Sequence, residues 1–147
     1  MSDEAELSLP GAGGPPTVLL CADDLMLAVR VEAAAGARGY RLVALDGIAD
    51  LAPALAAARP RAVVLDLTSP GFPLERVLAA VRGAEGAAPP VLAFYPHVLK
   101  DVGRAARAAG CDLVVPRSQF MTDMPALLER LVQRDPRDAV ESATVDE

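Results

Sequence analysis

The 147-residue sequence predicts an α/β fold, in which five parallel strands form one sheet with helices on both of its faces. Short apolar runs of the β type recur along the chain, and each is followed by a stretch whose apolar residues have helical spacing. Strands that alternate with helices of about 10 to 15 residues imply βαβ crossovers, which build a parallel sheet covered on both faces. The predicted fold is therefore doubly wound.

The strands are predicted from apolar runs at 17–22 (TVLLCA), 41–45 (RLVAL), 62–65 (AVVL), 91–95 (VLAFY) and 112–115 (DLVV). The first helix, from about residue 25 to residue 37, is apolar on most sides and closes on Gly39. The second helix, from about residue 48 to residue 58, places Ile48, Leu51 and Leu55 on one stripe.

The other three helices are also predicted from their apolar spacing. The third helix has an apolar face with spacing i, i+3, i+4, i+7, made of Leu74, Val77, Leu78 and Val81. The fourth helix covers roughly 98–109, and its inward residues are predicted to be Val98, Val102 and Ala105. The fifth helix begins near Thr122, which is a suitable N-cap, and is predicted to bury Leu127, Leu128, Leu131 and Val132.

The length of the chain fits a single domain with one substantial core, predicted over residues 17–133. Residues 1–16 are acidic and then rich in Gly and Pro, so we predict a disordered N-terminal tail. Residues 134–147 are polar and charged, and Pro136 follows the last helix, so we predict a second tail there.

Composition and charge exclude several classes of partner. The formal net charge of -6 argues against nucleic acid, because phosphate contacts need clustered Lys and Arg. Neither a membrane-spanning run nor the layout of a signal peptide is present, so we expect a cytoplasmic protein without a membrane partner. Cys21 and Cys111 lie in or beside apolar runs and are expected to pack as small hydrophobic residues. With the one histidine, His97, they make a poor metal-binding set.

Acidic residues follow two of the predicted strands at the point where ligands bind to open parallel sheets. Asp23 and Asp24 follow the first strand, and Asp66 follows the third. If these strands are neighbours, three carboxylates converge, and a divalent cation such as Mg²⁺ is the usual means of offsetting their repulsion. A carboxylate beside such a metal can also attack phosphorus and form an aspartyl phosphate.

Three motifs in order resemble the receiver domain of bacterial two-component response regulators, over about residues 17 to 133. VVLDLTSPG is similar to the third-strand motif of that family, CADD to its acidic pair, and AAGCDLVVPR to the approach to its fifth strand and the lysine that ends it. The resemblance implies a flavodoxin-like sheet with strand order 2-1-3-4-5. It implies that Asp66 is the phosphoacceptor, that Arg117 stands at the lysine position, and that Asp23, Asp24, Asp66 and the carbonyl of Thr68 bind Mg²⁺.

The sequence departs from the family pattern at four positions. Tyr95 replaces the Ser or Thr that contacts the phosphoryl group, and Arg117 replaces the lysine, which is not an equivalent donor. Ser118 stands where the family has proline, and Val114 stands where it has a switch aromatic. The register of the acidic pair also stays open. Counting from Gly39-Tyr40 gives Ala22-Asp23, whereas counting from the strand end gives Asp23-Asp24.

Each candidate residue also has a structural interpretation. Asp66 is a suitable turn residue whose side chain accepts a loop N–H, and Asp23 and Asp24 are suitable helix caps. Arg117 can pair with Asp66 as a simple salt bridge. Tyr95 is favoured as a packed aromatic at a strand end, and His97 as a solvent-facing loop residue.

The sequence supports three functional hypotheses. The first is a single-domain response regulator that takes a phosphoryl group onto Asp66 from a histidine kinase or phosphotransfer protein, with Mg²⁺. It would signal to a downstream protein over the fourth helix, fifth strand and fifth helix, a surface that is also the candidate for a homodimer. Such a protein is not an enzyme beyond self-phosphorylation and autodephosphorylation at Asp66.

The second hypothesis is a pseudo-receiver, which uses the same fold as an interaction module without phosphorylation. Tyr95, Ser118 and Val114 favour it. The third is a small flavodoxin-like protein that binds a nucleotide or flavin, which is disfavoured because no Gly-rich loop follows the first strand.

Overall fold

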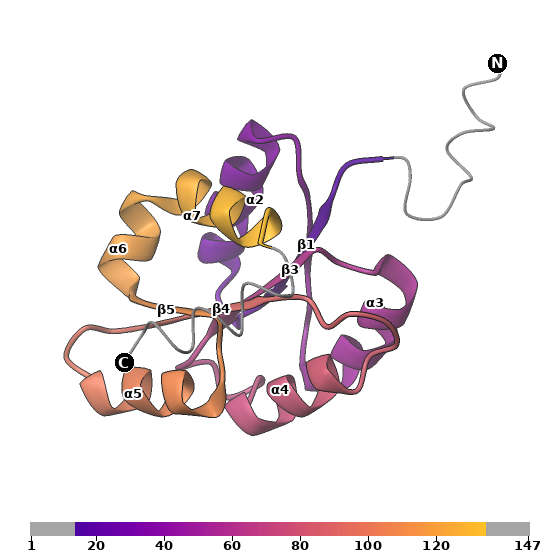
Figure 1. Cartoon of the computed structure of the whole chain (residues 1–147). Helices are drawn as coiled ribbons and strands as arrows, with labels where there is room; N and C mark the ends of the chain where they lie inside the picture. The colour runs from indigo at the N-terminus through magenta and orange to yellow at the C-terminus, as the bar shows by residue number, and fades with distance from the viewer. Residues whose placement is uncertain (1–13, 135–147) are drawn as a thin grey trace, which may run out of the picture.

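A computed structural model describes residues 14–134 of the chain (Figure 1). The predicted tails at 1–16 and 134–147 fall almost entirely outside the described residues. The strands are β1 (Thr17–Cys21), β2 (Arg41–Ala44), β3 (Ala62–Asp66), β4 (Val91–Tyr95) and β5 (Leu113–Pro116). The helices are α2 (Leu25–Ala37), η1 (Ile48–Asp50), α3 (Leu51–Ala58), α4 (Leu74–Arg82), α5 (Lys100–Ala109), α6 (Arg117–Thr122) and α7 (Met124–Val132).

The five strands form one parallel sheet in the order β2-β1-β3-β4-β5. This confirms the predicted fold class and strand order. β3 lies in the centre between β1 and β4, and all of its residues from Ala62 to Asp66 are buried. The carboxyl ends of β1 and β3 are therefore neighbours, which brings the acids that follow them to the same edge of the sheet.

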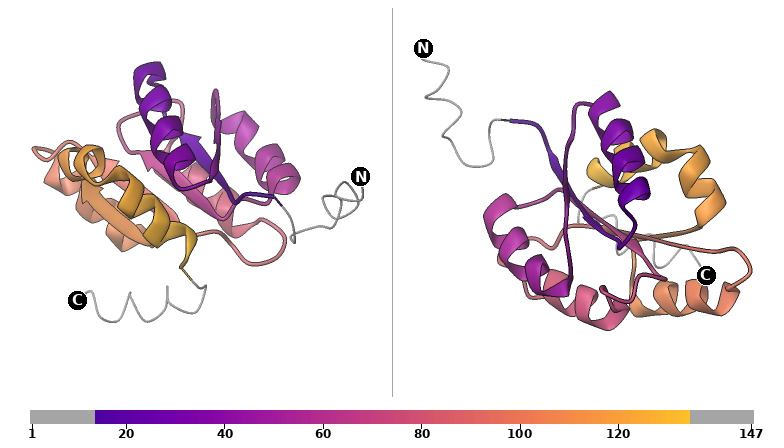
Figure 2. Two further views of the ribbon diagram at one scale, coloured as in Figure 1. Left: turned by 90° about the horizontal axis from the view of Figure 1, so that it is seen from above. Right: turned by 180° about the vertical axis from the view of Figure 1, so that it is seen from behind.

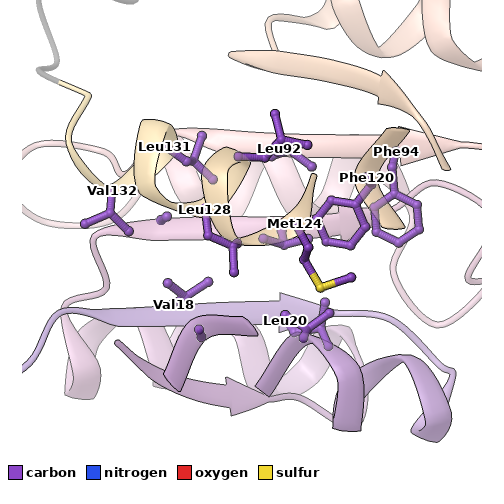
Figure 3. Packing of buried hydrophobic residues seen from close by; sticks show 14 of the residues in the cluster. Val18, Leu20, Leu92, Phe94, Phe120, Met124, Leu128, Leu131 and Val132 are labelled. Carbon is purple, nitrogen blue, oxygen red and sulfur yellow. The ribbon is translucent and has the colours of Figure 1, made fainter. Parts of the chain in front are cut away.

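Helices cover both faces of the sheet, with α2, α6 and α7 on one side and α3, α4 and α5 on the other (Figures 1 and 2). Alternate residues of each strand point to opposite faces, so the central strands contribute to two separate cores. On β3, Val64 packs under α2 and α7, whereas Val63 and Leu65 pack on the side of α3 and α4. Figure 3 shows the first of these cores, in which Leu128 and Leu131 of α7 lie against Val18, Leu20 and Leu92 of the sheet.

Two details of the predicted helices were wrong. For the helix predicted over roughly 98–109, the inward residues were given as Val98, Val102 and Ala105. In the structure Val98 precedes α5 and is 75% exposed, and Ala105 is also exposed. The buried residues of α5 are Gly103 and Ala106, because small residues let this helix approach the sheet closely. The predicted N-cap of the last helix was also wrong, because Thr122 ends a separate short helix, α6, and Asp123 stands at the N-cap of α7.

Helix α6 follows β5 directly and was absent from the sequence prediction. It begins at Arg117 after Pro116, and its buried residue is Phe120. The next helix, α7, begins at Met124 and buries Leu127, Leu128, Leu131 and Val132, as its spacing predicts. A six-residue helix with one buried residue carries too little periodicity to be recognised from sequence.

Both cysteines are free and buried, and they lie in the core of the face covered by α3, α4 and α5. Burial raises the pKa of the Cys21 thiol to about 12 and that of Cys111 to about 11.

His97 is exposed in the segment after β4, as predicted. No helix within residues 14–134 is long and apolar enough to cross a lipid bilayer.

Candidate functional site

Asp66 lies at the carboxyl end of the central strand β3 and is only 5% exposed. Its Oδ1 accepts hydrogen bonds from the backbone N–H of Thr68 at 2.9 Å and from the Thr68 hydroxyl at 2.8 Å. Asp66 therefore does form the turn contact that a turn residue at this position would make. The other carboxylate oxygen, Oδ2, faces Arg117, with 3.9 Å to Nη1.

Asp24 occupies the N-cap of α2. Its Oδ1 accepts from the backbone N–H groups of Met26 at 3.0 Å and Leu27 at 3.1 Å, which satisfies donors that the helix leaves free. Its Oδ2 lies 3.6 Å from Nη2 of Arg117. Asp24 and Asp66 thus each use one carboxylate oxygen locally and turn the other toward the same guanidinium.

Asp23 has a different environment from Asp24. Its Oδ2 accepts a hydrogen bond from the backbone N–H of Gly71 at 3.0 Å, and its own N–H donates to the hydroxyl of the buried Ser69 at 2.9 Å. A Cβ atom at Gly71 would lie 2.8 Å from Asp23 Oδ1, so a larger residue there would require the Asp23 carboxylate to move. Asp23 therefore anchors that loop, and it is Asp24 that shares a partner with Asp66.

Arg117, the first residue of α6, joins the site from the end of β5. Its guanidinium carbon lies 5.7 Å from the centre of the Phe94 ring, a cation–π distance. Phe94 is paired in register with Asp66, so both side chains point to the face covered by α2, α6 and α7. Sequence reasoning did not single out Phe94, although strand alternation together with this register would have placed it beside Asp66.

Tyr95 is not brought to the site. It follows Phe94 by one residue and points to the opposite face, where its half-buried ring packs against α5. A Cβ atom at Gly103 would lie 2.6 Å from Cε1 of Tyr95, so the ring occupies space that any larger residue of α5 would need. Tyr95 is therefore a packed aromatic at a strand end, the interpretation that the sequence favoured.

The oxygen donors have the right chemistry for Mg²⁺, because Asp24 and Asp66 aim one carboxylate oxygen each at a common region. That region contains the Arg117 guanidinium, and Asp23 is turned to Gly71. Among residues 14–134, no group of three or more Asp, Glu, His or Cys side chains is arranged to hold a metal ion. The donor set therefore fits Mg²⁺ by chemistry, and the Arg117 guanidinium lies beside two of its carboxylate oxygens.

Two surface hollows lie away from this site. One, of about 480 Å³, is lined by residues of α3 and α4 such as Leu55 and Ala80. The other, of about 270 Å³, lies near the start of β4 and is lined by Val91 and Arg134. Neither hollow is at the carboxyl ends of the strands, where a nucleotide or flavin binds to a doubly wound sheet.

Comparison with known proteins supports the fold assignment. No protein-family model and no curated protein matches the sequence. Among solved structures, a receiver domain of a response regulator from Bermanella marisrubri is similar with a TM-score of 0.70 and 19% identity, covering 81% of this chain and 99% of that one. The signal receiver domain of a putative repressor protein from Vibrio parahaemolyticus has a TM-score of 0.69 and 17% identity, covering 90% and 98%.

The receiver domain of a sensor histidine kinase from Pseudomonas aeruginosa is similar with a TM-score of 0.69 and 17% identity, covering 82% of this chain and 100% of that domain. That structure has a magnesium ion coordinated in its active-site cleft. At these identities the likeness concerns the fold. Residues 14–134 form a single domain with the fold of response regulator receiver domains.

Proposed function

We propose that the chain is a response regulator receiver module that accepts a phosphoryl group on Asp66 and signals through protein–protein contacts. The observation that carries this proposal is the position of Asp66. It ends the central strand, and its Oδ2 faces a guanidinium instead of an apolar neighbour. A carboxylate with a cation beside its reactive oxygen can act as a nucleophile toward phosphorus, because the cation stabilises the phosphoryl oxygens.

In the proposed step, Oδ2 of Asp66 attacks the phosphorus of a phosphohistidine on a kinase or phosphotransfer protein. An O–P bond forms, the N–P bond breaks, and the departing imidazole takes up a proton. Arg117 turns its N–H groups from the carboxylates toward the phosphoryl oxygens, with which a guanidinium pairs well. Asp23, Asp24, Asp66 and the carbonyl of Thr68 are the groups that would hold Mg²⁺, which supplies further positive charge when bound.

The test is covalent labelling read by intact mass. Incubation with acetyl phosphate and Mg²⁺ is expected to add one phosphoryl mass to the wild type and none to Asp66→Asn. Asp46→Asn is a matched control, because Asp46 is an exposed acid outside the site, and this variant is expected to be labelled like the wild type. If the wild type gains no mass with acetyl phosphate or with candidate kinases, the proposal fails.

The second candidate is a pseudo-receiver that works as an interaction module without phosphorylation. It is favoured by Tyr95, which leaves the site without the small hydroxyl of the family, and by Arg117, which occupies the region between Asp24 and Asp66. Restoring Tyr95→Thr with Arg117→Lys distinguishes the two. A gain of labelling in the double variant, with none in the wild type, would identify these two side chains as the block.

The proposed output surface consists of α5, β5 and α7, in keeping with the receiver fold. Val98 and Leu99 expose 75% and 41% of their surface just before α5, and we propose that they form an apolar contact with a downstream protein or a second copy. If this surface forms a homodimer, sedimentation is expected to detect dimers whose fraction falls in a Val98→Ser variant.

A histidine kinase as phosphoryl donor would place the chain in the cytoplasm.

A further inference from the structure

Arg117 contacts three separate elements around the acidic site. Its guanidinium lies 3.6 Å from Asp24 at the start of α2, 3.9 Å from Asp66 at the end of β3, and 5.7 Å from the centre of the Phe94 ring on β4. The side chain is 37% exposed, so its charge lies partly within the protein. These contacts come from segments far apart in the sequence, and each of them favours the same position of the guanidinium.

The start of α6 is also tied to Phe94 by a second residue. Phe120, three residues after Arg117, stacks on Phe94 with ring centroids 4.5 Å apart and an interplanar angle of 7° (Figure 3). Phe94 and Phe120 are both fully buried. Because Arg117 and Phe120 belong to one short helix, this stacking limits how far the backbone of Arg117 can move away from the site.

Asp24 and Asp66 each have one carboxylate oxygen that makes no local hydrogen bond, and both of these oxygens face Arg117. Oδ1 of Asp66 is used by Thr68, and Oδ1 of Asp24 by the helix cap. Oδ2 of Asp23 is used by Gly71. The two oxygens directed at a common region, Oδ2 of Asp24 and Oδ2 of Asp66, both lie nearest to Arg117.

We propose that Arg117 is the resident cation of the acidic site, and that a divalent cation binds there only by displacing it. A metal ion held by Asp24 and Asp66 uses the same two carboxylate oxygens, and a guanidinium that stays beside it adds like-charge repulsion. The cost of releasing Arg117 is therefore subtracted from the affinity for the metal. Since the arginine is partly exposed and its two ion pairs are long, removing it is expected to raise metal affinity by roughly tenfold.

This inference rests on the proposed function only in taking Asp66 as the centre of the site. It does not require Asp66 to be phosphorylated, because its readout is metal binding. A chain that binds Mg²⁺ in the predicted way without ever accepting a phosphoryl group would support the inference and contradict the proposed function.

The test is a Mg²⁺ titration followed by the NMR shifts of the backbone amides of 23–27 and 66–68, at constant ionic strength. Arg117→Met keeps the aliphatic stem over Phe94 and removes the charge, so it is expected to bind Mg²⁺ roughly tenfold more tightly than the wild type. Arg104→Met is the matched control, because Arg104 pairs with Asp101 on an exposed face of α5, and its Mg²⁺ affinity is expected to equal that of the wild type.

Arg117→Lys keeps the charge but lacks the planar fork that reaches two carboxylates at once, so its gain in affinity is expected to be smaller than that of Arg117→Met. It also serves as the test if the Met variant does not fold. Unchanged or weaker Mg²⁺ binding in the folded Arg117 variants would overturn the proposal. An equal gain in Arg104→Met would overturn it as well, because the effect would then be one of net charge.

Discussion

At the scale of single residues, Tyr95 illustrates how a bulky ring at a strand end packs away from a site. Its neighbour Phe94 lies in register with Asp66 and shares its face of the sheet. Tyr95 points to the other face, where glycine at position 103 makes room for its ring. The bulky ring is therefore accommodated by a small residue of α5, and Oδ2 of Asp66 faces Arg117.

Gly103→Ala is expected to destabilise the protein by about 1–3 kcal/mol, because the new Cβ would lie 2.6 Å from the Tyr95 ring. The same change in a Tyr95→Thr background is expected to stabilise it by up to about 1 kcal/mol, since alanine favours helix over glycine. The free energies of unfolding of the four proteins, measured in urea, form a double-mutant cycle. Equal effects of Gly103→Ala in both backgrounds would contradict the packing described here.

Because the two cysteines are buried, we expect the free energy of unfolding to fall at high pH. The thiol pKa is raised from an ordinary 9.0 to about 12 for Cys21 and about 11 for Cys111 by burial. Below pH 9 the thiols are protonated in both states, so their protonation adds no pH dependence. Above pH 9 the unfolded thiols ionise while the folded ones do not, and the free energy of unfolding falls by about 1.4 kcal/mol per pH unit for each thiol, up to its folded pKa.

Urea unfolding at about pH 8 and about pH 10 measures this loss. A Cys21→Ala/Cys111→Ala variant is the control, because the other titrating groups remain in it. The double variant is expected to lose less stability than the wild type between the two pH values. The interpretation is wrong if both proteins lose the same amount.

At the scale of elements, the acid at the N-cap of α2, Asp24, makes two kinds of contact. Asp24 caps the helix through Oδ1 and faces Arg117 through Oδ2. The cap is a local feature, because an acid directly before a helix satisfies its first N–H groups in many proteins. The second contact depends on α6, which follows a strand at the far side of β4 and brings Arg117 across the end of the sheet.

Asp24→Ala is expected to lower the free energy of unfolding by about 1 kcal/mol, because the amide groups of Met26 and Leu27 lose their acceptor. Asp24→Asn keeps a capping oxygen and is expected to cost only a few tenths of a kcal/mol. Chemical denaturation of the two variants separates the cap from the charge. If Asn costs as much as Ala, the ion pair with Arg117 is the main contribution and not the cap.

At the scale of the whole molecule, one sheet holds together two cores that do not touch each other. Leu128 of α7 belongs to one core and Leu51 of α3 to the other, and both are fully buried. The central strands β1, β3 and β4 contribute side chains to both cores. We therefore expect the two cores to unfold together, as is usual for single domains of this size.

Leu128→Ala and Leu51→Ala are each expected to cost about 2–5 kcal/mol and to keep a single unfolding transition. Leu25→Ala is the control, because Leu25 is 83% exposed, and its effect is expected to stay within about 0.5 kcal/mol. Unfolding followed by circular dichroism and by calorimetry tests both points. Two separate transitions in either core variant would show that the faces unfold independently.

The pattern of the sequence alone determined the alternation of strands and helices, the apolar faces of α3, α4 and α7, and the position of Asp66 at a strand end. Such features follow from periodicity, because burial of one face repeats every two residues in a strand and about every 3.6 in a helix. The prediction of the inward face of α5 also relied on periodicity. It was wrong because the buried residues, Gly103 and Ala106, give almost no hydrophobic signal.

Only the tertiary structure decided which acid shares a cation with Asp66, and where Tyr95 and Arg117 lie. The sequence left the register of the acidic pair open between Ala22-Asp23 and Asp23-Asp24. In the structure Asp23 accepts a hydrogen bond from Gly71, and Asp24 faces Arg117. These contacts join residues separated by 40 positions or more in the chain. No periodicity encodes them, because they depend on how close two loops and a short helix come once the sheet has formed.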